Sequence, residues 1–153
     1  MIKPDSLRAA IVAAIPALAR DAERLLMFID RGSVRGFMTA SRSFEYRYKL
    51  NIIITDFAGS PSTVMLAILD WARINQPELT VPPNEALTFE ADILDNQAVD
   101  MSLEIMLTES VAVTVGEDGT TDLHHIEEPA LLFNDDTGLF EPIPPLSGYS
   151  VED

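Results

Sequence analysis

The chain has 153 residues, 47% of them apolar, and it contains no cysteine. Its length is that of one ordinary domain, and its apolar content excludes a disordered protein. The lack of cysteine excludes disulfides, iron–sulfur clusters and thiolate zinc sites, and it fits folding in a reducing cytosol. The first residues lack the long apolar segment of a signal peptide and the longest apolar stretches are strand-sized, so we expect neither an export signal nor a membrane span.

The charge is both large and unevenly distributed. The net charge is −15, and all ten basic residues lie between Lys3 and Arg73. Residues 1–73 hold ten basic and seven acidic residues, a net charge of +3, whereas residues 74–153 hold eighteen acids and no lysine or arginine. This balance argues against nucleic acid or an anionic membrane as the main partner. Because the second half has no lysine or arginine of its own, its acids must pair with the first half, pair with a partner, or stay solvated.

The first part of the sequence predicts a helix followed by a short strand. Asp5 is expected to cap a helix over residues 5–15, in which apolar residues recur every three or four positions. A proline then interrupts the pattern, so residues 17–20 are expected to form a separate helical turn. A short apolar strand over residues 25–30 is expected to end in a turn over residues 31–33.

Two stretches of alternation predict long strands with one wet face. Apolar and polar residues alternate over residues 44–54 and again over residues 99–108, with Ile53 and Met106 as the exceptions. This period of two is typical of a strand that is buried on one side only. Between the two stretches, Ser60 and Pro61 predict the start of a helix that runs to about Gln76.

Shorter segments complete the second half. Residues 87–93 are predicted to form a strand, residues 111–115 to continue or re-enter the sheet, and a Gly-Glu-Asp-Gly turn to lead into a strand over residues 121–126. The order α-β-β-α-β-β-β predicts an α+β fold, a mostly antiparallel sheet with two helices packed on one face. We expect one α+β domain over residues 1–127 and an acidic, proline-containing arm over residues 128–153 that is extended or disordered.

The sequence predicts no active site. His124 and His125 are the two histidines, and because they are adjacent on a predicted strand their side chains should point to opposite faces and share no metal. The sequence has no nucleophile elbow, phosphate loop or calcium-binding loop. We therefore expect no enzyme activity, no catalytic or metal-binding residues and no cofactor, since an enzyme would have to depend on the two histidines.

Basic side chains on the strand predicted over residues 44–54 have two possible uses. They point away from its aromatic residues, so the two kinds of side chain cannot form one nucleic-acid-binding surface. Within one copy, Arg47 or Lys49 can face Glu104 across the sheet. Because such pairs cannot absorb the charge of the acidic half, we also expect the basic part of one copy to contact the acidic part of the next, which closes into a ring.

Five segments of the sequence resemble one known family. They read MIKPDSLRAA, LLMFID, SFEYRYKLNIIITDFAG, ILDWARINQPEL and FEADILDNQAVDMSLEIMLTE. Over residues 1–127 they resemble the phage tail completion protein R (GpR) family of contractile-tailed temperate phages and prophages. The segments are scaffold and surface sequence and carry no catalytic signature.

The resemblance implies a structural virion protein of the phage tail. Family members are similar in role to tail terminators, which form a hexameric ring that caps the head-proximal end of the tail tube and allows joining to the head. The resemblance therefore implies a homo-oligomeric ring that contacts tail tube and sheath proteins and head–tail connector proteins. We also expect no specific binding of nucleic acid, no membrane, and assembly in the bacterial host cytoplasm.

The charge pattern and the resemblance together give a hypothesis for the subunit interface. Three basic residues of one copy are expected to face acids of its neighbour. The basic set is Arg42, Arg47 and Lys49, and the acidic set is Glu90, Asp92, Glu104 and Glu109. The alternative function is a small acidic protein that mimics DNA and occupies a basic site on a host nucleic-acid enzyme. The acidic half supports this alternative, but its acids are spread over strands, turns and the arm and do not line one surface.

Overall fold

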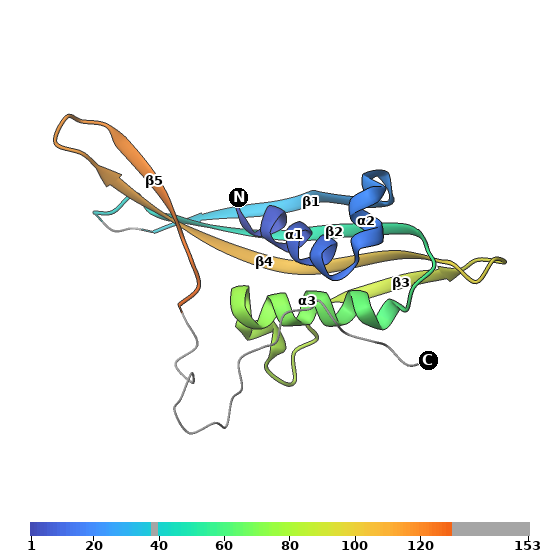
Figure 1. Ribbon diagram of the computed structural model, residues 1–153. Helices are drawn as coiled ribbons and strands as arrows, with labels where there is room; N and C mark the ends of the chain where they lie inside the picture. Colours follow the sequence, from blue (N-terminus) through green and yellow to red (C-terminus); the bar gives the residue numbers. More distant parts are fainter. Residues whose placement is uncertain (38–39, 130–153) are drawn as a thin grey trace, which may run out of the picture.

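The computed structural model, which describes residues 1–37 and 40–129, contains a five-stranded antiparallel sheet with helices on one face (Figure 1). Its elements are α1 (Lys3–Ala14), α2 (Pro16–Arg20), η1 (Ala22–Arg24), β1 (Leu25–Gly36), β2 (Phe44–Phe57), α3 (Pro61–Asn75), η2 (Pro77–Thr80), β3 (Thr88–Ile93), β4 (Val99–Val115) and β5 (Thr121–Ile126). The predicted α+β fold and order of the main elements are confirmed. Apart from residues 128 and 129, the predicted C-terminal arm lies outside the described residues.

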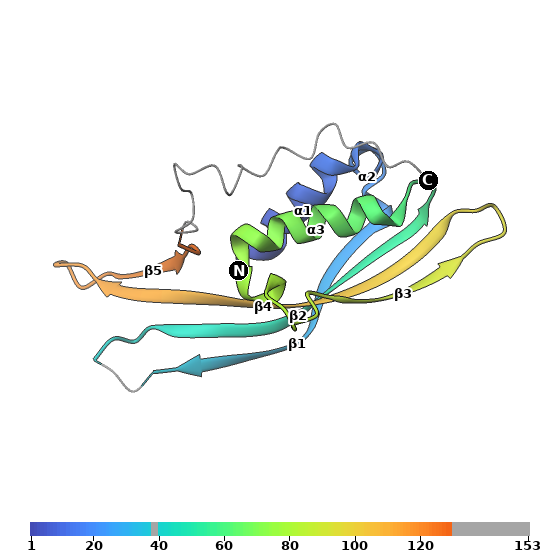
Figure 2. The ribbon, with the colours of Figure 1, turned by 90° about the horizontal axis from the view of Figure 1, so that it is seen from below.

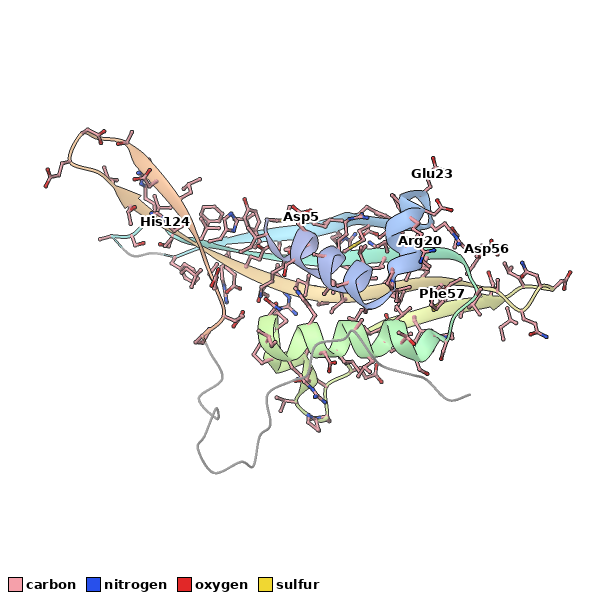
Figure 3. The ribbon with its side chains drawn as sticks, in the orientation of Figure 1. Asp5, Arg20, Glu23, Asp56, Phe57 and His124 are labelled. Carbon is pink, nitrogen blue, oxygen red and sulfur yellow. The ribbon has the colours of Figure 1, made fainter. Side chains whose placement is uncertain are left out.

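The strand order is β1-β2-β4-β3, and β4 is long enough to pair with two strands along one side. Its first part, up to Glu104, pairs with β3, and its last part, from Ser110, pairs with β5. The hairpin of β4 and β5 therefore extends beyond both α1 and α3 (Figure 2). Figure 3 shows His124 on this hairpin and Asp56 at the opposite end of the sheet.

The core lies between the sheet and the two long helices, which Figure 2 shows on the same face. Alternate side chains of β2 and β4, such as Ile52 and Leu103, are fully buried there. Leu7 of α1 and Ile68 of α3 meet them from the helix side. Each such side chain contributes roughly 1.5–3 kcal/mol when it is removed from water. The apolar side chains of the predicted alternation thus hold the helices on this face of the sheet.

The strand β1 is longer than predicted. The sequence pattern predicts an end at Asp30, but the strand continues to Gly36, with a bulge between Ile29 and Arg31. The predicted turn over residues 31–33 is therefore wrong. The bulge accommodates one extra residue of β1 between Ile29 and Arg31. Pairing with the long strand β2 then keeps the following residues extended, with Gly32 opposite Tyr48.

The helix α1 begins earlier than predicted. Its N-cap is Ile2 and Asp5 lies in the first turn, so the prediction that Asp5 caps the helix is wrong. Pro4 suits the first turn because that position needs no N–H donor. The first free amides are instead satisfied by the carboxylate of Glu109, which reaches them from β4.

The other predicted boundaries are close to those of the structure. The separate turn before β1 is present as α2, from Pro16. Helix α3 begins after Ser60 and ends at Asn75, although the Ser60 side chain makes no capping hydrogen bond. Residues 111–115 continue β4 without a break.

Candidate assembly surface

The face of the sheet opposite the helices, called the outer face below, is divided by charge. Residues that pair across the ladder share a face, so the outer-face positions follow from the register. On β1 and β2 they include Arg31, Arg35, Arg47 and Lys49. On β3 and β4 they include Glu90, Asp92, Asp100 and Glu104. Two acids, Asp30 and Glu45, also lie on the basic side, so its excess of positive charge is modest.

One predicted pair forms within a single copy. Lys49 Nζ lies 3.1 Å from Glu104 Oε2, and both side chains are partly exposed. The prediction that Lys49 can face Glu104 across the sheet is confirmed. An exposed pair of this kind contributes roughly 0.2–1 kcal/mol, so it positions the two side chains more than it stabilises the fold.

The other two predicted basic residues, Arg42 and Arg47, lie toward the end of the sheet that carries β5. Arg42 Nη2 donates a hydrogen bond of 3.2 Å to Thr121 Oγ1, which links the segment before β2 to β5. Arg47 is exposed and lies between Ser33 of β1 and Thr108 of β4. Within residues 1–37 and 40–129, no carboxylate lies within ion-pair distance of Arg47, Arg31 or Arg35.

Two of the predicted acidic residues lie on an uncovered strand. Glu90 and Asp92 are exposed on β3, opposite Ser102 and Asp100 of β4. In the part of the chain that the structure describes, neither carboxylate has a lysine or arginine partner. The structure thus places these acids across the sheet from the unpaired arginines of β1 and β2.

Glu109, the remaining predicted acid, lies in the interior with an exposed fraction of 3%. Its Oε1 accepts hydrogen bonds from the backbone N–H groups of Ile2 at 2.6 Å and Lys3 at 3.3 Å. Its Oε2 accepts a hydrogen bond of 2.5 Å from the Tyr48 hydroxyl. Burial, together with this carboxylate, raises the pKa of Tyr48 far above its ordinary value.

Lys3 extends this buried polar cluster, and neither Lys3 nor Gln76 was expected from the sequence to be a site. Lys3 Nζ donates to Gln76 Oε1 at 2.7 Å and to Glu128 Oε1 at 3.0 Å. Gln76 also makes two hydrogen bonds to Thr108 of β4. Its Nε2 donates to the Thr108 hydroxyl, and its Oε1 accepts the Thr108 backbone N–H. The cluster ties the N-terminus, the end of α3 and the end of the described chain to the middle of β4. These contacts satisfy polar groups that burial would otherwise leave without partners.

The two histidines take part in unrelated contacts. His124 Nε2 lies 3.2 Å from Thr114 Oγ1, and His125 Nδ1 lies 3.6 Å from Glu109 Oε1. Across the described ranges, no group of three or more histidine, aspartate or glutamate side chains is arranged to hold a metal ion. Of the helices that the structure describes, none is long and apolar enough to cross a membrane.

Both ends of the strand order expose apolar side chains as well as backbone edges. On the helix side of the sheet, Val34 of β1 is 63% exposed, and Phe89 and Ile93 of β3 are 60% and 82% exposed. Leu26 and Phe28 of β1 are also exposed, on the outer face. Two uncovered strand edges with apolar side chains are typical of a surface that another chain covers.

Comparison with known proteins identifies the family. The family model for P2 phage tail completion protein R (GpR) matches residues 1–129. The chain is 39% identical over 132 residues to the tail completion protein R of Escherichia phage P2, which covers 84% of each chain. No solved structure matches the chain. These matches give no support to the DNA-mimic alternative. The chain belongs to the phage tail completion protein R family of structural phage proteins.

Proposed function

We propose that this protein caps the head-proximal end of the phage tail tube as a ring and presents the surface to which the head is joined. The observation that carries this proposal is the outer face, which is basic beside β1 and acidic beside β3. A surface with opposite charges on its two sides suits contact between the unlike sides of successive copies. Such contacts generate a closed ring when the rotation between copies closes.

The proposed ring contact uses the exposed residues of the sequence hypothesis. Arg47 of one copy faces Glu90 of the next, and Lys49, which keeps its pair with Glu104, lies near Asp92. Arg42 is left out because it bonds Thr121 of its own chain. Glu109 is left out because it is buried and bonded within its own chain. A ring order of six is proposed from the likeness in role to tail terminators.

The proposed partners follow from this position in the tail. The ring contacts tail tube and sheath proteins on one side and head–tail connector proteins on the other, in particles assembled in the host cytoplasm. The net charge of −15 favours repulsion of DNA phosphates, so a duplex could pass the ring without being held.

Electron microscopy of an induced lysate with this gene disrupted tests the proposal. We expect overlong, headless or missing tails, restored when the intact chain is supplied in trans. Supplying the chain with Arg47→Glu should restore them poorly. The matched control is Arg20→Glu, an equal charge reversal at an exposed position of α2. Normal tails joined to heads in the disrupted lysate would contradict the proposed function.

A further inference from the structure

Among residues 1–37 and 40–129, nothing pairs with the outer backbone edges of the two strands that end the sheet. Every residue of β3 is exposed, and so is every residue of β1 from Asp30 to Gly36. Soluble proteins protect edge strands with proline, lysine, bulges or covering segments, because a free edge pairs with other chains. β1 has a bulge but neither a proline nor a lysine along its 12 residues. Its edge is therefore suited to receive another strand.

We propose that β3 of one copy adds to the free edge of β1 of the next copy, so that one antiparallel sheet continues through the subunit contact. The proposal rests on the proposed ring for its biological setting. The direction of the strands fits, because successive antiparallel pairing from β1 through β2 and β4 makes β3 run opposite to β1. Strands β3 and β1 of successive copies in the same orientation are therefore antiparallel, which is the pairing of every other neighbour in the sheet.

Side chains on both faces agree on the same register. If Asp92 lies opposite Arg31 of the next copy, Phe89 lies opposite Val34, because the sum of paired residue numbers is constant in an antiparallel ladder. The charged pair then lies on the outer face, and the two exposed apolar side chains cover each other on the helix side. A shift by one residue would turn every side chain of β3 to the opposite face, so Phe89 would leave the helix side and Asp92 the outer face.

The same contact cannot form within one copy. β1 and β3 are separated by β2 and β4, three strand spacings that amount to about 14 Å. Within a copy, β3 lies level with the beginning of β1, through the ladder from Thr88 to Phe28. Pairing with the second half of β1 therefore shifts each copy along the strand direction, so the strands tilt relative to the ring axis, as they do in closed sheets.

Disulfide trapping in assembled tails tests this contact. The chain has no cysteine, so Val34→Cys together with Phe89→Cys introduces the only two thiols. Residues opposite each other in a ladder have Cβ atoms about 4.5–5.5 Å apart, near the range for a disulfide, whereas the two edges of one copy are too far apart. The control carries Ser33→Cys with Phe89→Cys, on the same two strands but on opposite faces.

We expect the matched pair to give a ladder of multimers of this chain on a non-reducing gel, ending at the ring order, and the control to stay largely monomeric. Tails that contain the matched variant and show no multimers would overturn strand addition while leaving tail completion intact. Equal cross-linking of both variants would also overturn strand addition, because it would indicate that the thiols meet by random collision. The proposed function fails separately, if purified tails do not contain the chain at all.

Discussion

The Tyr48 hydroxyl on β2 donates a hydrogen bond of 2.5 Å to the Glu109 carboxylate on β4, beneath the N-terminus of α1. The same carboxylate accepts the N–H of Ile2, 107 residues away in sequence. One buried side chain therefore fastens the first helix to the centre of the sheet. Because the helix has no side-chain cap of its own, the tertiary contact replaces the local one.

Replacement of Glu109 by leucine should strongly destabilise the fold. The change leaves two backbone donors and the Tyr48 hydroxyl without their acceptor, and a loss of about 3 kcal/mol in the free energy of unfolding is expected. Urea denaturation followed by circular dichroism measures it. The matched control is Glu104→Gln on the same strand, which removes only the exposed pair with Lys49 and should cost less than about 1 kcal/mol. Equal losses in the two variants would show that the Glu109 contacts have no special weight.

Stability should fall at high pH because of Tyr48. Burial and Glu109 raise the pKa of Tyr48 in the folded state above its ordinary value of 10.0, so the folded protein keeps a proton that the unfolded chain loses. This contribution is complete below about pH 10 and is lost as the pH rises above it, by up to roughly 1.4 kcal/mol per pH unit. Tyr48→Phe removes the titrating group.

Denaturation of both proteins between pH 9 and pH 11.5 isolates this effect, because the two proteins differ only in the Tyr48 hydroxyl. The unfolding free energy of the wild type should decline more steeply than that of Tyr48→Phe. Parallel curves would mean that the folded Tyr48 ionises as easily as a free tyrosine.

The long strands could be predicted from sequence because their physical cause is local. In β2 and β4, alternation of apolar and polar residues reflects one buried and one wet face, and it held over nearly the whole of each strand. The second half of β1 could not be predicted in this way. Residues 31–36 contain two glycines and a serine, which favour a turn, and they are extended because they pair with β2.

For Glu109, the alternation of the strand and the charge of the residue lead to opposite predictions. It falls on the apolar face of the alternation that includes Ile105 and Leu107, so its parity placed it in the core. Its charge instead suggested an exposed position in an interface. The partners that permit its burial come from the N-terminus and from β2, and no local rule connects these segments. The subunit contact also depends on a second copy. The sequence of one chain therefore predicts which charges are available for the contact, but not which strands meet there.

Reversal of charge at Arg47 should impair assembly without unfolding the protein. Arg47 is exposed and unpaired within residues 1–37 and 40–129, so Arg47→Glu should change the unfolding free energy by less than about 0.5 kcal/mol. In the ring it would place like charges together, and we expect the titre of infectious particles to fall about tenfold or more. Complementation titres measure this loss.

Glu90→Arg, tested alone and combined with Arg47→Glu, distinguishes a direct contact from a general effect of charge. Each single variant should assemble poorly, whereas the double variant should recover because the opposite signs are restored across the interface. Glu90 is the suitable partner because Glu104 is already paired with Lys49 in its own chain. A double variant no better than the worse single variant would exclude this pairing.

The association of copies should weaken with salt more than the fold does. The proposed contact brings together exposed charges beside β1 and β3, and the Debye length falls from about 10 Å at 0.1 M salt to about 3 Å at 1 M. The fold depends on the buried core and on the Glu109 cluster, which salt screens far less. Sedimentation of the purified chain should therefore show smaller species at high salt while circular dichroism stays constant. If the species instead grow with salt, apolar burial between Phe89 and Val34 outweighs the charge contact, and the Arg31–Asp92 pair then serves to fix the register of the strands more than to hold the copies together.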